Sequence, residues 1–348
     1  DISAVDLGAL HEIKNSLTDV LVRGGTHDFF SSWDFTSPDP CSSFAGVTCS
    51  IIIIYATSFS PITTLSSSLS IIRRRRITSL TLGTGLSDSP GLAGSLSPSL
   101  ANLTELTQLV LFPGVVSGSI PPQLGNLKKL RVISLTNNRL TGPIPTSISA
   151  LPELHTLDLS HNQLTGSVPP DLISSSSGLK VLILASNRLS GAFPSVPTQL
   201  LHLDLKNNRF SGRLPEQLPL SLRYLSASEN EMWGPLNGLE SLPELVYLDL
   251  SMNHFSGPIP SSLFRPNLSS MLLQRNNLSG GIPPLPLLLR SSSSSYGQAS
   301  IVDLSHNFLT GKLSTALAGV ESLYLNNNRL IGTVPEEYVE SVYRSSTK

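Results

Sequence analysis

Apolar and polar residues alternate in a stretch, LHTLDLSHNQLTGSVP, that begins at Leu154 and recurs along the chain with the same residues in the same places. Near-copies begin at Leu130, Leu179, Leu245 and Leu268. A unit that repeats every 21–25 residues predicts a solenoid, because each unit buries its apolar face by packing on its neighbours.

Within each unit the alternation predicts a short strand. In the stretch from Leu154, the inward positions are Leu154, Leu157 and Leu159, and the outward positions are Thr156, Asp158 and Ser160. Stacked strands of this kind form a parallel sheet on the concave side of the coil. Gly166 permits the bend that follows, and Pro169 ends the next segment because it lacks a backbone N–H.

An asparagine occupies the same place in nine successive units, where its amide can bond backbone groups of its own and the adjacent coil. We interpret this column as structural. Its members are Asn138, Asn162, Asn187, Asn208, Asn230, Asn253, Asn276, Asn307 and Asn328.

The first 50 residues differ from the repeats. Residues 4–22 have apolar side chains at roughly helical spacing, with Asp6 available as an N-cap. The two cysteines, Cys41 and Cys49, lack the paired spacing of a zinc site, which favours a disulfide and an oxidising compartment. A cap here would cover the apolar end of the first repeat.

The cap and the repeats together resemble plant extracellular leucine-rich-repeat proteins. The cap pattern of that family is matched by Trp33, Cys41, Gly46, Val47 and Cys49, and the L-x-G-x-[IV]-P half of the repeat resembles the plant-specific class. The resemblance implies an α/β solenoid: a plant-specific leucine-rich-repeat superhelix with a parallel concave β-sheet and an N-terminal helical cap. The expected organisation is a cap at 1–50, an insertion at 51–76, about eleven repeats at 77–339, and a tail at 340–348 without the family's usual cysteine cap.

The insertion at 51–76 interrupts this order, and three interpretations stay open. The first is a flexible or strand-like insertion, and the second is a membrane span with a basic flank. The third is that Arg73–Arg76 form a basic patch that contacts an anionic cell-wall polysaccharide weakly. Its Pro61 and many Ser and Thr residues disfavour the span.

Composition and charge exclude nucleic acid as a partner, because the net charge is −1 and 23 basic residues face 24 acidic ones. The start at Asp1 without methionine fits a mature secreted protein or a trimmed chain. Three glycosylation sequons, at Asn102, Asn267 and Asn277, also favour secretion.

Outward strand positions are where function can vary without disturbing the core. The richest candidate patch contains Tyr224, Tyr247, Met252, Glu229 and Trp233. The side chains His155, Asp158, His161, His202 and Asp204 could form a metal or acid–base cluster. We discount that cluster because LDLS is the consensus strand of the class, so we expect no enzyme activity, metal or cofactor. The expected ligand-binding residues are Asp158, His161, His202, Asp204, Tyr224, Glu229, Tyr247 and Met252.

The resemblance implies an extracellular recognition module, either secreted or on the outer face of the plasma membrane, acting in cell-surface signalling or defence. Its expected partner is a peptide or protein ligand on the concave face, with a co-receptor at the edge. An alternative is a cell-wall defence protein similar to polygalacturonase inhibitors, whose partner would be a pathogen cell-wall enzyme. Ice binding is a minor alternative that the irregular outward positions disfavour.

Overall fold

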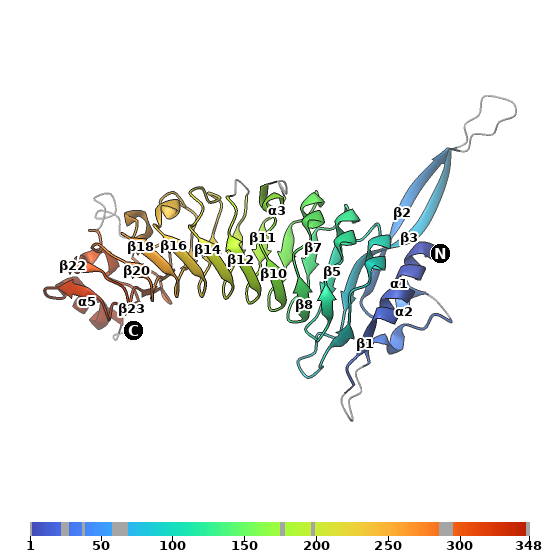
Figure 1. Ribbon diagram of the computed structural model, residues 1–348, viewed down its shortest axis with the longest axis horizontal. Coiled ribbons are helices and arrows are strands. Elements are labelled where there is room, and N and C mark those ends of the chain that lie inside the picture. The colour runs from blue at the N-terminus through green and yellow to red at the C-terminus, as the bar shows by residue number, and fades with distance from the viewer. Residues whose placement is uncertain are drawn as a thin grey trace. The chain divides into compact units, whose positions relative to one another are not determined.

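A computed structural model describes residues 2–21, 28–36, 39–57, 69–174, 178–195, 199–284 and 295–345. The chain divides into two compact units, Asp1–Gln163 and Leu164–Lys348. Each unit is built of short strands and tight turns, as the alternating pattern predicts (Figure 1).

The first unit begins with a helical cap. Its elements are α1 Ala4–Ser16, β1 Leu17–Asp19, the 3-10 helix η1 Phe29–Ser32 and α2 Pro40–Ser43. Trp33 is fully buried, stacks on Phe44 with ring centroids 5.3 Å apart, and donates its indole N–H to the Ala45 carbonyl at 3.0 Å. A disulfide joins Cys41 in α2 to Cys49.

The N-cap role expected for Asp6 was wrong. The residue before α1 is Ser3, whose side chain makes no capping bond, and Asp6 lies in the first turn. Its fully buried carboxylate accepts hydrogen bonds from Arg76 Nε at 3.0 Å, Arg76 Nη2 at 2.9 Å and the Ile77 backbone N–H at 3.0 Å. Asp6 therefore ties the cap helix to the first repeat, because a buried carboxylate needs charged and hydrogen-bonding partners.

The main sheet of the first unit has the strand order β2-β3-β5-β7-β9. Strands β6 and β8 pair in a second sheet, and β4 pairs antiparallel with β1. The elements after the cap are β2 Val47–Thr57, β3 Leu69–Leu82, β4 Leu92–Gly94, η2 Pro98–Asn102, β5 Gln108–Leu111, β6 Ser117–Ser119, η3 Pro122–Asn126, β7 Val132–Ser134, β8 Arg139–Gly142, η4 Thr146–Ala150 and β9 Thr156–Asp158.

The described parts of the 51–76 insertion are strands. Strands β2 and β3 pair antiparallel from Val47↔Leu80 to Thr57↔Leu69, and the ribbon extends away from α1 (Figure 1). Of the expected alternatives, the structure shows the strand-like one in these parts, and residues 58–68 lie outside the described residues. The membrane-span interpretation was wrong for the described parts, because a span here would be a helix.

The second unit repeats the same architecture. Its main sheet has the order β11-β13-β15-β17-β19-β21-β23, and its second sheet runs β10-β12-β14-β16-β18-β20. The main-sheet strands are β11 Val181–Ile183, β13 His202–Asp204, β15 Tyr224–Ser226, β17 Tyr247–Asp249, β19 Ser270–Leu272, β21 Ile301–Asp303 and β23 Ser322–Tyr324. The second-sheet strands are β10 Gln163–Gly166, β12 Arg188–Ala192, β14 Arg209–Gly212, β16 Glu231–Gly234, β18 His254–Gly257 and β20 Asn277–Leu278.

Short helices and a terminal strand pair complete this unit. The remaining elements are α3 Pro170–Ser174, η5 Asn237–Leu239, η6 Ser261–Leu263, η7 Thr315–Leu317, β22 Thr310–Lys312, β24 Arg329–Ile331 and α5 Glu336–Ser345. Strands β22 and β24 pair parallel. Helix α5 occupies most of the stretch expected as a tail at 340–348, and residues 346–348 lie outside the described residues.

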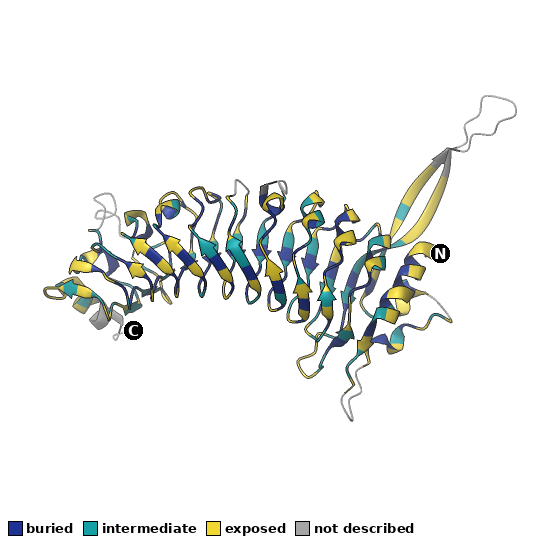
Figure 2. Ribbon diagram, in the orientation of Figure 1, coloured by how far each residue is buried: buried dark blue, intermediate teal, exposed yellow. Residues whose placement is uncertain are grey.

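The core is a column of apolar side chains between the two sheets of each unit (Figure 2). Leu154, Leu157 and Leu159 are fully buried, as the alternation predicts. Each asparagine of the column bonds two coils. Asn230, for example, accepts the Phe210 N–H at 2.9 Å and donates to the Leu205 and Ala227 carbonyls at 3.0 Å. These bonds satisfy backbone groups at each turn that would otherwise be buried without partners.

Candidate recognition surface

Three consecutive strands of the second unit, β13, β15 and β17, carry an aromatic row. The parallel register places His202 beside Tyr224, and Tyr224 beside Tyr247. The His202 and Tyr224 rings stack with centroids 4.0 Å apart and planes 7° apart, and the two tyrosine rings stack at 4.4 Å and 3°. In-register parallel strands lie about 4.8 Å apart, so rings at the same position of each strand stack face to face.

A second row on the same face is polar and partly covered. It contains Asp204, Ser226 and Asp249, in register with one another. Ser226 is 1% exposed and Asp249 6% exposed, so neighbouring side chains cover these outward positions. Asp204 is less covered, and its carboxylate accepts the Lys206 backbone N–H at 3.0 Å.

Charged and flexible side chains border the rows where the strands end. Lys206 pairs with Glu229 of the next repeat at 3.5 Å. Glu229 and Met252 occupy left-handed turn positions with φ of 56°, and the Met252 side chain is half exposed. The border therefore combines an ion pair with an adaptable apolar side chain.

Burial is the main electrostatic influence on this surface. It raises the pKa of Asp204, and the Lys206 N–H opposes that rise. It also raises the pKa of Tyr224 and of Tyr247, which the neighbouring carboxylates Asp204 and Asp249 raise further. Both tyrosines are therefore neutral at physiological pH and present hydroxyl groups that can donate.

The predicted ligand-binding residues are only partly brought together. His202, Asp204, Tyr224, Glu229, Tyr247 and Met252 lie on adjacent repeats of the second unit. Asp158 and His161 belong to the first unit: Asp158 is half-buried at the end of β9, and His161 is exposed at a turn with φ of 55°.

Trp233 does not belong to the aromatic row. It lies in β16 of the second sheet, where the Arg213 guanidinium sits 5.2 Å from its ring centroid. The expectation that it joins the patch was wrong, because its place in the repeat is that of Thr165, just before the glycine of the second strand.

The aspartates of the LDLS strands have structural partners. In Asp158, Asp249 and Asp303 one carboxylate oxygen accepts both the backbone N–H and the hydroxyl of the serine two residues later, at 2.6–3.1 Å. These bonds give the recurring aspartate a structural role. Among the described residues, no group of three His, Cys, Asp or Glu side chains could hold a metal ion.

Two features of this surface escaped sequence reasoning. His202 stacks on Tyr224, and Lys206 pairs with Glu229. Aligning each repeat on its asparagine would have indicated both. The alignment places His202, Tyr224 and Tyr247 at one position, and it places Lys206 and Glu229 at neighbouring positions of adjacent repeats.

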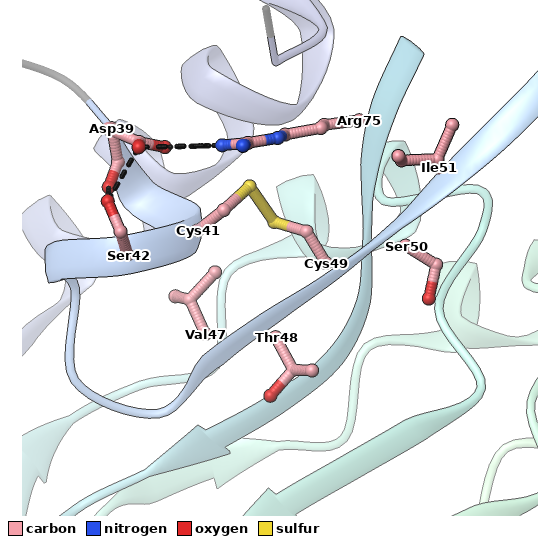
Figure 3. A pocket seen from close by; sticks show the side chains of 9 residues that line it. All are labelled: Asp39, Cys41, Ser42, Val47, Thr48, Cys49, Ser50, Ile51 and Arg75. Carbon is pink, nitrogen blue, oxygen red and sulfur yellow. Dashed lines mark hydrogen bonds and ion pairs between the residues drawn. A yellow bond between two sulfur atoms is a disulfide. The ribbon is translucent and has the colours of Figure 1, made fainter. Parts of the chain in front are cut away.

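A pocket in the first unit lies beside the disulfide. Its lining includes Cys41, Cys49 and the exposed Arg75–Asp39 ion pair at 3.2 Å, and Asp39 also accepts the Ser42 hydroxyl (Figure 3). The arginine is already paired, so the pocket is part of the cap's joint with β3 rather than a developed ligand site.

Comparison with known proteins matches the N-terminal region, residues 3–50, to the leucine rich repeat N-terminal domain. Residues 119–164, 199–219 and 244–265 match leucine rich repeats. Receptor-like protein 18 from Arabidopsis thaliana is 35% identical over 178 residues, which are 48% of this chain and 17% of that protein.

Two solved structures are also similar. One is the LRR ectodomain of the plant membrane receptor kinase GASSHO1/SCHENGEN3 from Arabidopsis thaliana in complex with CASPARIAN STRIP INTEGRITY FACTOR 2. It has 29% sequence identity and a TM-score of 0.62, and the match covers 96% of this chain and 43% of that chain. The other is the plant peptide hormone receptor RGFR1 in complex with RGF2, with 28% identity and a TM-score of 0.52, covering 68% of this chain and 46% of that one. The chain thus spans less than half the length of each of these relatives.

Proposed function

Because this chain is built of leucine-rich repeats behind a leucine-rich-repeat N-terminal domain, we propose that it is an extracellular recognition module that binds a peptide or protein ligand. The observation that carries the proposal is the row of stacked rings of His202, Tyr224 and Tyr247 on the main-sheet face of the second unit. The similar receptor complexed with RGF2 is a peptide hormone receptor, which supports the same ligand class.

The row has the physical properties of a binding anchor. Its rings hold one another at 4.0–4.4 Å, so little side-chain entropy is lost when a ligand covers them. Aromatic side chains also dominate the energetics of protein interfaces. The tyrosine hydroxyls and the Lys206–Glu229 pair at the border supply polar contacts that would fix the register of an extended ligand.

Asp158 and His161 are proposed as ligand contacts of the first unit, independent of the aromatic row. We also propose N-glycosylation at Asn102, Asn267 and Asn277, whose side chains are all exposed. Glycans there would be consistent with an extracellular location.

The test is ligand capture from plant apoplastic fluid with three forms of the chain. These are the wild type, Y224S/Y247S, and the control Y324S, which removes a half-exposed tyrosine from β23 in the same sheet. Ligands recovered by the wild type are identified by mass spectrometry, synthesised or purified, and titrated against all three proteins by calorimetry.

We expect Y224S/Y247S to raise the Kd at least about tenfold and Y324S to leave it within about twofold. Equal affinity of all three forms would refute the placement of the site. A captured fungal polygalacturonase that the purified chain inhibits would instead establish the cell-wall inhibitor alternative.

A further inference from the structure

The outer part of the β2–β3 ribbon exposes an unusual amount of apolar surface. Ile51 is 64% exposed, Tyr55 63% and Ile71 59%, and Ile53, Ile54 and Ile72 are between 37% and 49% exposed. The exposed fractions of these six side chains add up to the surface of about three fully exposed ones. Large exposed apolar patches on soluble proteins usually mark interaction sites. Figure 2 shows this ribbon almost entirely in the exposed colour.

The apolar surface lies on both faces of the ribbon. Residues directly opposite in an antiparallel pair share a face, and Tyr55 is opposite Ile71 on one face while Ile54 is opposite Ile72 on the other. One step nearer the base, Ile53 is opposite Arg73 and Ile52 is opposite Arg74. Each face therefore has an apolar level farther from the cap and an arginine level closer to it.

The base of the ribbon is fixed to the cap. Arg76 pairs with the buried Asp6, Arg75 pairs with Asp39, and the Cys41–Cys49 disulfide joins β2 to α2 (Figure 3). Two of the four arginines expected to form one cationic patch are thus engaged within the protein. Within the described part of the chain, Arg73 and Arg74 have no carboxylate partner, and no Asp or Glu occurs in the sequence from Ile51 to Arg76.

From this arrangement we propose that the outer β2–β3 ribbon is a peripheral membrane-binding element that docks on a bilayer containing anionic lipids. Arg73 and Arg74 contact headgroup phosphates, and Tyr55, Ile54, Ile71 and Ile72 enter the boundary between headgroups and acyl chains. The proposal is independent of the ligand site on the second unit.

The spacing of the two levels fits this depth. Tyr55 is three residues beyond Ile52, the partner of Arg74, which is about 10 Å along a strand. Interfacial elements bury their apolar side chains about 5–10 Å into the headgroup and acyl boundary, and tyrosine is enriched at that level. Arginine pairs with phosphate through parallel hydrogen bonds.

A bilayer also fits the two-sided exposure better than a protein groove or a polysaccharide chain. A groove would have to enclose the ribbon on both faces, whereas lipid surrounds it without a preformed shape. An anionic polysaccharide would use the arginines but leave in water the four apolar side chains that a bilayer would cover, Ile54, Tyr55, Ile71 and Ile72.

The backbone limits how far the ribbon enters. Strand β2 is an edge of the main sheet, and β3 pairs with β5 only from Ser79 onward. The outer edges therefore carry backbone groups that need water or headgroups, since unpaired groups are costly in hydrocarbon. Docking is accordingly shallow and reversible. Among the described residues, no helix is long and apolar enough to cross a membrane.

The experiment is vesicle flotation with the full chain, using phosphatidylcholine vesicles with or without roughly 30% phosphatidylglycerol at about physiological ionic strength. The variants are I54S/I72S, which removes one apolar pair, and R73S/R74S, which removes the exposed charges. The matched control is I331S/V334S, which removes two side chains that are 65% and 63% exposed in the second unit.

We expect the wild type and the control to float with anionic vesicles. I54S/I72S should lower the partition coefficient at least about tenfold, because each lost buried methylene weakens partitioning several-fold. R73S/R74S should abolish the preference for anionic over neutral vesicles. Failure of the wild type to bind anionic vesicles, or unchanged binding of I54S/I72S, would overturn the proposal.

A second readout does not depend on the folding of the double variants. In Y55W the new indole should shift its emission to shorter wavelength and be quenched by lipids brominated near the glycerol backbone, measured against the wild-type background from Trp33 and Trp233. Retention of the wild type but not of R73S/R74S on polygalacturonate, with no emission shift of Y55W on vesicles, would overturn the proposal and assign the ribbon to an anionic polymer instead.

Discussion

Asn253 offers the sharpest test of how the coils are held together. Its side chain is 5% exposed and makes four hydrogen bonds. Its oxygen accepts the Met232 N–H at 3.0 Å, and its nitrogen donates to the carbonyls of Ala227 at 2.8 Å and of Leu250 and Ser251 at 3.2 Å. Met232 and Ala227 belong to the preceding repeat, so Asn253→Ala removes bonds between coils as well as within one.

The magnitude follows from the groups left without this partner. A buried backbone group that loses its hydrogen bond costs about 1–3 kcal/mol, and N253A leaves the Met232 N–H in this state, whereas the Ala227 carbonyl keeps the bond from Asn230. We expect a loss of about 1–3 kcal/mol in the free energy of unfolding of the second unit. The assay is urea unfolding followed by the fluorescence of Trp233, which follows Met232 in β16. Hydrogen exchange at the Met232 amide should accelerate in parallel.

Two further variants make the test discriminating. Asn237→Ala removes an exposed asparagine in η5 of the same unit and should cost less than about 0.5 kcal/mol. Asn253→Asp keeps an acceptor for Met232 but loses the donors and buries a charge, so it should be at least as destabilised as N253A. If N253A and N237A unfold at the same urea concentration, the asparagine column does not hold the coils together.

Two more predictions concern charged groups. Burial raises the pKa of Asp204, so the unfolded chain releases the carboxyl proton at lower pH than the folded chain does. The ionised carboxyl therefore lowers the free energy of unfolding at pH values above its ordinary pKa and has no such effect below it. Asp204→Asn keeps an acceptor for the Lys206 N–H, so its melting temperature should be no lower than that of the wild type at neutral pH. At about pH 3 any gain in melting temperature should disappear. A clearly lower melting temperature of the variant at neutral pH would contradict this. Asp6→Ala leaves the Arg76 guanidinium and the Ile77 N–H without their buried partner and should destabilise the first unit by about 3–5 kcal/mol, as measured by urea unfolding. Asp39→Ala, which breaks the exposed pair with Arg75, is the matched control and should change little, and equal effects of the two would refute the role of Asp6.

The repeats were predictable from the sequence because their cause is local. Each leucine, asparagine and glycine acts within its own coil or on the next one, so the same spacing produces the same turn each time. The left-handed turn just before each asparagine illustrates this, since Asn137, His161, Ser186 and Met252 all adopt φ between 53° and 56° there. Side-chain identity matters little at that position because the neighbouring bonds hold the backbone.

The contacts that escaped prediction have partners far apart in sequence. Asp6 binds Arg76, and 70 positions separate them, so the start of the helix could only suggest an N-cap. The run of isoleucines after Cys49 has high strand propensity, but its partner, residues 69–76, is identified only by the pairing itself. Ser226 is likewise buried at an outward position, which the alternation within its own strand does not predict.

The candidate surface lies where the repeat departs from its own consensus. In Asp158, Asp249 and Asp303 the serine two residues later donates both its N–H and its hydroxyl to the carboxylate. At Asp204 that serine is replaced by Lys206, which donates only its N–H and sends its ammonium group to Glu229. The carboxylate of Asp204 thereby retains accepting capacity beside the stacked rings, and the ion pair extends the polar border. Lysine in place of serine two residues after the aspartate therefore leaves Asp204 with one hydrogen bond fewer than Asp158, Asp249 and Asp303, which is why we propose it as a ligand contact.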